Sequence, residues 1–361
     1  MIQTMPARWL PAGAGPTQSQ KVSQPRVCPQ CWRDQAAYPV APALPHAPIL
    51  TLPANIAPNQ APTGRITPGP AWRVDAHQHC WQPARGDYGW LRADVPALAP
   101  LLRDFGPADL QPLLAAHQIV QTVLVQAAPS EAETDYLLGL ASAHGFIAGV
   151  VGWVDLSRAD AVATLQRWAR HPKFKGVRPM LQDLPDAGWI ARAPHPDAMQ
   201  ALLQLGLRFD ALVQPWHLAP LQQFLQAWPT LPVMIDHAAK PQLAKGWSGS
   251  WADDWRHGLA AVAGHPQVMC KLSGLLTEAA AADCQSTGAA VAALQPVWQA
   301  LLQHFGPGRL VWGSDWPVLT LAADYGRWVA VSDALLGSLP PAGQAAVWAG
   351  NARRFYGLAS A

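Results

Sequence analysis

Charged residues are scarce in this sequence, and long apolar runs are missing. Only 13% of the 361 residues are charged, the formal net charge is +2, and the lysines and arginines are scattered. Scattered basic residues give no electrostatic footprint for nucleic acid or for an anionic membrane surface. No apolar run approaches the roughly 18 residues needed to span a bilayer, and the chain does not open on a signal-like segment. The sequence therefore predicts a cytoplasmic protein with a small-molecule partner, and it leaves the oligomeric state open.

Cysteine is also scarce, with five residues in the chain. An odd number in a chain of this length does not indicate a disulfide framework. Cys28 and Cys31 form one C-x-x-C pair, which could be half of a zinc site or a redox motif. No second pair follows it, and no strand–helix–strand pattern surrounds it, so we do not place the function there.

Proline and tryptophan are abundant instead. Residues 1–70 hold 14 of the 36 prolines and lack any helical or alternating periodicity. Such a composition cannot bury enough surface to offset the entropy of ordering, so this segment is predicted to be a disordered, low-complexity extension. A translation start downstream of it is an alternative. Residues 71–361 are predicted to form one domain, and most of the 18 tryptophans are expected in its core or around a pocket.

From residue 72 onward, short β-branched, apolar runs alternate with amphipathic helical stretches. This alternation is typical of strand–helix–strand units with a parallel sheet. Eight such units over about 290 residues match a single closed (β/α)8 TIM barrel, of the α/β class, better than an open sheet. The predicted strands cover 73–80, 122–128, 147–155, 174–181, 208–214, 233–238, 268–274 and 309–316. The predicted helices include 130–144, which a capping box of Ser130 and Glu133 should start, and 289–305, 324–336 and 342–356.

Polar residues gather at the carboxyl ends of three predicted strands, where a TIM barrel places its active site. The first strand ends with His77 and His79, the sixth with His237 and the eighth with Asp315. Histidines two residues apart on a strand point to the same side, so His77 and His79 can converge on one metal ion or one substrate oxygen. Each residue alone has an ordinary structural explanation, such as a helix cap for Asp315. Their joint occurrence at matching heights of the barrel favours a functional site.

Seven segments carry recognisable motifs in a fixed order along the chain. They are VDAHQHCW (74–81), RGDYGW (85–90), VLVQA (123–127), KGVRPMLQD (175–183), IDHAAKP (235–241), CKLSG (270–274) and GSDWP (313–317). Over residues 73–358 the chain thereby resembles the amidohydrolase superfamily. The similarity is to the amidohydrolase-related branch that contains sugar lactonases of the L-fuconolactonase and L-rhamnonolactonase type.

The resemblance implies a hydrolase that opens the ester ring of a sugar-type lactone with water. His77 and His79 match the histidine pair of strand one, His237 the histidine of strand six and Asp315 the aspartate of strand eight. Asp315 is the only carboxylate among these matched positions, which makes it the expected general base. His237 is expected to stabilise the carbonyl oxygen.

Four further residues near strand ends are candidate substrate contacts, namely Gln126, Trp153, Arg178 and Lys271. Gln126 could hydrogen-bond a sugar hydroxyl, and Trp153 could stack on the ring. Arg178 could bind a substrate carboxylate or hydroxyl, or it could form an ion pair with Asp183 or Asp186. The sequence leaves these two interpretations of Arg178 open.

The motifs depart from those of metal-dependent relatives at strand five. Such relatives have a histidine before a Pro-Trp pair, whereas this chain has Gln214 before Pro215 and Trp216, with His217 after them. Strand four also offers no lysine placed to be carbamylated between two metals. The resemblance therefore implies no obligatory cofactor, or one weakly bound divalent cation, zinc by preference, held by His77, His79 and Asp315 (Zn²⁺ accepts such ligands). A binuclear site is not expected.

Two other functions stay open. One is a metal-dependent decarboxylase or hydratase on the same barrel, and the other is a non-catalytic barrel that acts as a binding protein. Retention of all the matched positions argues against the second. Neither the choice of lactone nor the need for a metal follows from one sequence, because selectivity depends on loop shape and hydroxyl contacts.

Overall fold

The fold is a barrel of eight parallel strands, and the structure, a computed structural model, describes residues 72–247 and 249–359. The predicted extension over residues 1–70 lies outside the described residues. The strands pair in chain order, each parallel to the next. They are β1 (Arg73–Gln78), β2 (Ile119–Val125), β3 (Ile147–Gly152), β4 (Phe174–Val177), β5 (Arg208–Ala211), β6 (Val233–Ile235), β7 (Val268–Leu272) and β8 (Leu310–Trp312). Gln78 and Trp316 form a parallel bridge that joins the last strand region to the first, which confirms the predicted (β/α)8 barrel.

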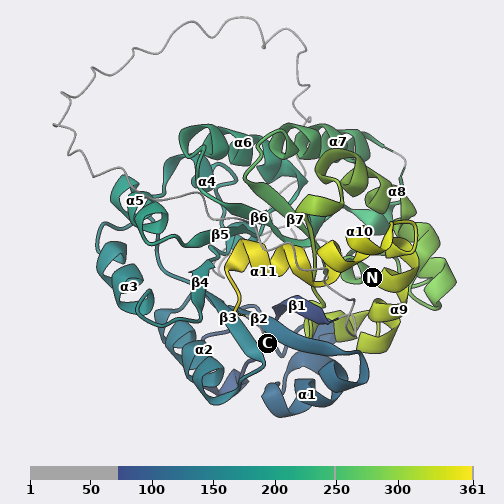
Figure 1. The fold of residues 1–361 in the computed structure, drawn as a ribbon, viewed down its shortest axis with the longest axis horizontal. Coiled ribbons are helices and arrows are strands. Elements are labelled where there is room, and N and C mark those ends of the chain that lie inside the picture. The colour runs from purple at the N-terminus through teal and green to yellow at the C-terminus, as the bar shows by residue number, and fades with distance from the viewer. Residues whose placement is uncertain (1–71, 248, 360–361) are drawn as a thin grey trace, which may run out of the picture. The chain divides into compact units, whose positions relative to one another are not determined.

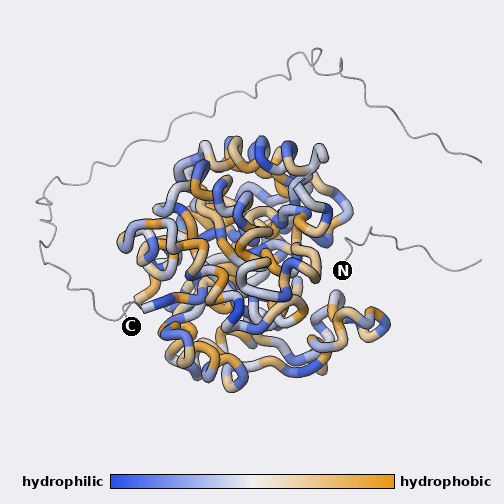
Figure 2. The backbone as a smooth tube through the Cα atoms, turned by 90° about the vertical axis from the view of Figure 1, so that its right-hand side faces the viewer, coloured by the Kyte–Doolittle hydropathy of each residue, from blue (hydrophilic) through white to orange (hydrophobic). Residues whose placement is uncertain are grey.

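The helices lie around the strands, most of them on the outside of the barrel (Figure 1). They are α1 (Pro107–Ala116), α2 (Glu131–Ala143), α3 (Ala161–Trp168), α4 (Trp189–Arg192), α5 (Pro196–Gln204), α6 (Leu218–Ala227), α7 (Ser250–Ala263), α8 (Thr287–Phe305), α9 (Tyr325–Leu336), α10 (Pro341–Ala345) and α11 (Asn351–Tyr356). Apolar and polar residues alternate along many of these helices, as expected for elements with one face on a core (Figure 2). Among the described residues, no helix has both the length and the apolar character that crossing a bilayer requires.

The barrel has two apolar layers. Outward-facing strand residues pack against the helices, as where Phe209 of β5 meets Phe224 of α6 with ring centroids 4.8 Å apart. Inward-facing strand residues, such as Val123 and Met234, pack instead with Phe355 and Tyr356 of α11. Helix α11 crosses the centre of the barrel in Figure 1. One end of the barrel is therefore filled with apolar side chains, and polar chemistry is left to the end where the strands finish.

The predicted helices 130–144, 289–305 and 324–336 correspond to α2, α8 and α9. The predicted helix 342–356 is divided, because a π-helical turn over Ala346–Gly350 separates α10 from α11. Asn351 follows this turn, is buried, and donates from Nδ2 to the carbonyl of Leu310 at 2.7 Å. A tertiary contact with β8 thus fixes the direction of α11, which local periodicity does not record.

Candidate active site

The four residues expected at the strand ends lie in one cluster at the carboxyl end of the barrel. The rings of His77 and His79 are 5.0 Å apart between centroids, and those of His77 and His237 are 4.4 Å apart. Asp315 Oδ1 lies 3.3 Å from His79 Nε2, 3.7 Å from His77 Nε2 and 3.8 Å from His237 Nε2. Three imidazoles therefore face one carboxylate oxygen.

Two members of this cluster, His237 and Asp315, have strained backbone conformations. His237 and the three residues that follow it, 238–240, have φ values between 49° and 58°, and Asp315 has a φ of 59°. Left-handed backbone costs a non-glycine residue roughly 1–2 kcal/mol. Such strain persists only where the surrounding structure imposes it, and it concentrates at functional sites. The strain therefore marks the same residues as the sequence motifs.

Two glycines make room for the histidines. A Cβ at Gly274, whose φ is 60°, would lie 2.4 Å from His237 Nδ1. A Cβ at Gly313 would lie 2.6 Å from the Cβ of His77. Both glycines belong to strand-end motifs. Gly274 is required by the close approach of the His237 imidazole, and Gly313 by the close approach of the His77 Cβ and backbone.

A buried ionic layer lies against His77. Lys271 Nζ is 2.6 Å from Asp210 Oδ2, 2.9 Å from Asp236 Oδ1 and 3.1 Å from His77 Nδ1. The hydroxyl of Tyr356 in α11 donates to Asp210 Oδ2 at 2.7 Å. Burial, reinforced by the nearby Lys271 charge, lowers the pKa of His77 well below its usual value. Lys271, expected to contact substrate, is thus engaged by protein carboxylates and by a neutral His77.

Sequence reasoning missed the two carboxylates of this layer. It treated Asp315 as the only matched carboxylate, but Asp236 and Asp210 are also fully buried in the barrel, against Lys271. The signals were present. Asp236 directly precedes His237, and Asp210 stands between Phe209 and Ala211, so the period of a strand turns it away from the apolar outer layer.

Arg178 and Gln126 are locked together at the side of the cluster. Arg178 Nη1 lies 3.3 Å from His77 Nε2 and 3.4 Å from Asp236 Oδ2. Its Nη2 donates to the backbone carbonyl of Gln126, whose Nε2 donates to the Arg178 carbonyl at 2.6 Å. Arg178 Nε and Gln126 Oε1 are buried and have no protein partner among the described residues. One donor and one acceptor thus remain unsatisfied within the described part of the protein.

Arg178 forms an ion pair, but not with Asp183 or Asp186, the partners that the sequence suggested. Asp186 pairs with Arg192 instead, at 2.7 Å, and the carboxylate beside Arg178 is Asp236. Local sequence distance suggested Asp183 or Asp186, but the barrel brings Asp236, which follows β6, into contact with Arg178, which follows β4.

Trp153 lies apart from the ionic cluster. It lines a pocket of about 400 Å³ formed by the loops after β3 and β4, together with Asp155, Met180, Asp183 and Trp189.

His217, the histidine beyond the expected strand-five position, also lies outside the cluster. Its Nδ1 accepts a hydrogen bond at 3.0 Å from the backbone N–H of Gln214, so it caps a turn and is absent from the two candidate metal-binding groups among the described residues.

One group of residues fits a divalent cation. His77, His79 and Asp315 each offer a ligand atom, all within 4.8 Å of one another. His79 Nδ1 lies 2.8 Å from the Val125 carbonyl and must donate to it, which leaves a lone pair on Nε2 directed at Asp315. A lone pair facing a carboxylate is favourable only with a proton or a cation between them. Two imidazoles and a carboxylate suit zinc.

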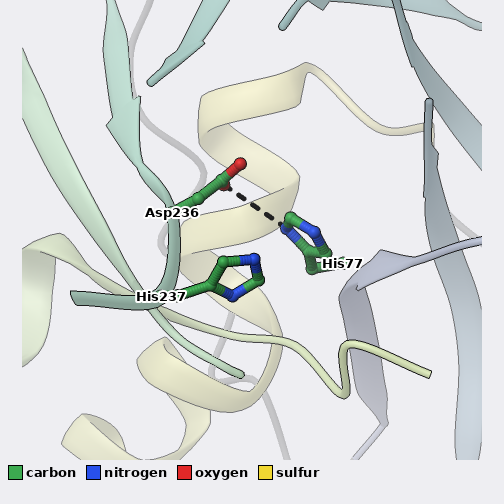
Figure 3. Close-up of side chains that lie close together, drawn as sticks. All are labelled: His77, Asp236 and His237. Carbon is green, nitrogen blue, oxygen red and sulfur yellow. Dashed lines mark ion pairs between the residues drawn. The ribbon is translucent and has the colours of Figure 1, made fainter. Parts of the chain in front are cut away.

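A second group, His77, Asp236 and His237, fits a cation less well (Figure 3). The two oxygens of Asp236 already face Lys271 at 2.9 Å and Arg178 at 3.4 Å. A metal ion there would meet two cationic side chains, and Coulomb repulsion in a buried site is strong. The residues therefore accommodate one ion better than two.

Protonation states follow from the burial of the cluster. Burial works to raise the pKa of Asp315, but the imidazoles, His237 first, outweigh it and hold this pKa below its usual range. Burial lowers the pKa of His237 to about 4. At neutral pH the site thus holds an ionised Asp315 next to a neutral His237, a combination able to accept one proton and to hydrogen-bond an oxygen.

The barrel is similar to known proteins in sequence and in fold. Residues 74–358 match the family described as amidohydrolase. L-fucono-1,5-lactonase of Burkholderia ambifaria is 46% identical over 292 residues, which cover 79% of this chain and 95% of that protein. L-fucono-1,5-lactonase of Burkholderia multivorans is 37% identical over 294 residues, covering 80% and 97%. A crystal structure of an amidohydrolase from Burkholderia multivorans with bound zinc is 34% identical, with a TM-score of 0.73 over 80% of this chain and 100% of that one.

Proposed function

Because this chain belongs to the amidohydrolase family, we propose that it hydrolyses the ester ring of a sugar-type lactone. The observation that carries hydrolysis is the convergence of three imidazoles on the ionised Asp315 at the open end of the barrel. The substrate class rests on the two relatives named L-fucono-1,5-lactonase, which match the barrel almost from end to end. L-fucono-1,5-lactone is therefore the first substrate to test.

Asp315 is the general base of this proposal. Lactone opening requires a proton to leave the attacking water and a proton to reach the departing ring oxygen. Asp315 is ionised and faces the site, so it can accept the first proton and return it to the alkoxide in the second step. The leaving group stays tethered to the acyl carbon, so one acid–base group is enough.

The remaining polar groups orient the substrate. Neutral His237 can donate a hydrogen bond to the carbonyl oxygen as negative charge develops there. Arg178 Nε supplies an unused donor and Gln126 Oε1 an unused acceptor, which suit the hydroxyls of a sugar ring. Trp153 provides an aromatic wall in the adjoining loops, on which an apolar sugar face can stack. Lys271 does not contact the substrate in this proposal; its ammonium group holds Asp236 and His77 in position.

A single divalent cation, zinc by preference, fits among His77, His79 and Asp315, where it would supply Lewis acidity at the reacting oxygen. His79 is held for that role by its hydrogen bond to Val125. Three protein ligands are the usual set of a catalytic zinc site. Arg178 Nη1, however, lies 3.3 Å from His77 Nε2, so we expect binding to be weak and the ion to be helpful but not obligatory.

The decisive experiment is a panel of five- and six-membered aldonolactones, followed with a pH indicator because ring opening releases acid. We expect turnover of L-fucono-1,5-lactone above the spontaneous rate, with kcat/KM in the ordinary enzymatic range of about 10⁴ M⁻¹s⁻¹ or more. Aromatic carboxylic acids, assayed for carbon dioxide release, serve as the contrasting substrates. Decarboxylation of these acids without turnover of any lactone would replace this proposal with the decarboxylase alternative.

A further inference from the structure

The start of α2 departs from the capping box expected from the sequence. Ser130 Oγ accepts from the backbone N–H of Glu133 at 3.2 Å, which is the expected half. In a capping box the Glu133 side chain would return to the Ser130 N–H, but that group donates to the Ala128 carbonyl at 2.9 Å. The Glu133 carboxylate instead accepts from the Ala127 N–H at 3.0 and 3.1 Å and from the Ala128 N–H at 2.8 Å. It therefore binds the segment that follows β2.

Glu133 is fully buried and forms no ion pair within the described part of the chain. Burial raises the pKa of its carboxyl to about 7, while the two backbone donors and the charge of Arg178 favour the ionised form. The hydrogen bonds at its two oxygens are all donated to the carboxyl, as an ionised group requires. A buried charge without a direct counter-ion calls for another source of compensation.

One peptide group connects this carboxylate to Arg178. The Ala127 N–H that donates to Glu133 and the Gln126 carbonyl that accepts from Arg178 Nη2 belong to the same peptide bond. An anion at the N–H end and a cation at the carbonyl end both stabilise the peptide dipole, and hydrogen bonds in such a chain strengthen one another. The Glu133 charge is therefore matched by the Arg178 charge across a single amide.

The RGDYGW segment (85–90), which the proposed reaction does not use, also contacts the segment that follows β2. Trp90 Nε1 donates to the Ala127 carbonyl at 2.7 Å, and Asp87 accepts from Ser130 Oγ at 3.2 Å. Glu133 thus holds both peptide groups that flank Ala127, and Trp90 holds the second of them at its carbonyl end. Such double anchoring fixes the backbone at Gln126, whose side chain also binds the Arg178 carbonyl.

We infer that Glu133 is a positioning residue which, through the Gln126–Ala127 peptide, holds the Arg178 guanidinium against His77 and Asp236 and keeps its Nε–H available to the substrate. Trp90 assists from the other side of Ala127. The kinetic consequence rests on the proposed function, whereas the coupling between Glu133 and Arg178 does not. Because Glu133 is remote from the proton transfer, its loss should weaken substrate binding more than turnover.

The test is a double-mutant cycle of Glu133→Gln and Arg178→Met, assayed at pH 8 so that the carboxyl of the wild type is ionised. We expect Glu133→Gln to raise KM about tenfold while kcat changes about threefold or less. With Arg178→Met already present, the same substitution should raise KM about twofold or less, because the group it positions is gone. Equal effects in the two backgrounds would overturn the inference, as would a loss confined to kcat.

Glu131→Gln is the matched control, since it removes the same charge from the first turn of α2 at a half-exposed position. It should leave KM unchanged. Trp90→Phe is the second variant if Glu133→Gln does not fold. It removes the donor to Ala127, and it should raise KM in the wild type and lose that effect beside Arg178→Met.

A second readout separates this inference from the proposed function. If the wild type turns over no lactone, the proposed function fails. The double-mutant cycle can then be measured by urea unfolding, which needs no substrate. We expect the effects of Glu133→Gln and Arg178→Met on the unfolding equilibrium constant to miss additivity by about fivefold or more. Additive effects in that measurement would overturn the link between Glu133 and Arg178.

Discussion

Asp315 owes its chemical character to its neighbours. Desolvation alone would favour a neutral acid, yet His77, His79 and His237 place their polar ring edges around one of its oxygens. The carboxylate is therefore ionised at neutral pH without a cationic lysine or arginine in direct contact. Its left-handed backbone turns it back toward β1, where its N–H donates to the His77 carbonyl at 2.7 Å.

Replacement of Asp315 by asparagine tests the general-base role. Asp315→Asn keeps the volume but cannot accept the proton of water, so kcat should fall by at least about 10²-fold. The measurement is kcat for the wild type and the variant, before and after exhaustive chelation, with circular dichroism as the check on folding. We expect the chelated wild type to keep a substantial part of its activity. A variant that kept more than about a tenth of wild-type kcat would exclude the base role.

The loop after β7 and the turn after β6 act as a pair. The turn over 237–240 keeps the left-handed backbone that directs His237 inward, and Gly274 leaves the space into which that imidazole fits. Ser273 adds a hydrogen-bond partner for His237 Nδ1 at 2.9 Å. The position of His237 is consequently a property of two elements, and a change in either should move it.

Gly274→Ala should displace His237, an effect that goes beyond the cost of placing alanine in a left-handed backbone. Gly306 has nearly the same φ, 61°, but nothing within 4 Å of its Cβ position, so Gly306→Ala is the matched control. The control should cost roughly 1–2 kcal/mol of stability through its left-handed backbone alone. Gly274→Ala should cost more, because its Cβ meets His237, and should also lower kcat by about tenfold or more. Urea unfolding and steady-state kinetics would measure both effects, and equal behaviour of the two variants would contradict this reasoning.

At the scale of the whole barrel, the described residues complete both the sheet and its core. The bridge between Gln78 and Trp316 joins β1 to the segment after β8, and α11 fills the opposite end with Phe355 and Tyr356. The four clustered residues, His77, His79, His237 and Asp315, come from β1 and from the segments that follow β1, β6 and β8. All of these elements lie within residues 72–359.

A chain that begins at residue 71 should therefore fold and work. We expect its melting temperature to lie within about 2 °C of that of the full chain, and its kcat/KM within about twofold, because no strand of the barrel is removed. Calorimetry and the lactone assay provide the comparison. A large fall in either quantity would mean that residues 1–70 contribute to the folded barrel or to its active site.

The sequence by itself determined the barrel and the polar residues at the carboxyl ends of its strands. Alternating strand and helix patterns require no knowledge of distant contacts, because each reflects the period of its own element. The strand-end position of His77, His79, His237 and Asp315 follows from the same local pattern, since parallel strands of a barrel finish on one side. Recognition of their family motifs then indicated the class of reaction.

Only the tertiary structure decided which charges meet. Asp210, Asp236 and Lys271 lie on neighbouring strands, and their pairing depends on the register and closure of the barrel, which no local pattern contains. The same holds for Glu133, where a capping pattern is satisfied in one half and redirected in the other. A side-chain contact between distant segments depends on how the whole chain packs. A buried charge is costly unless it is paired, and its partner is the group that lies nearest in space, which need not be near in sequence.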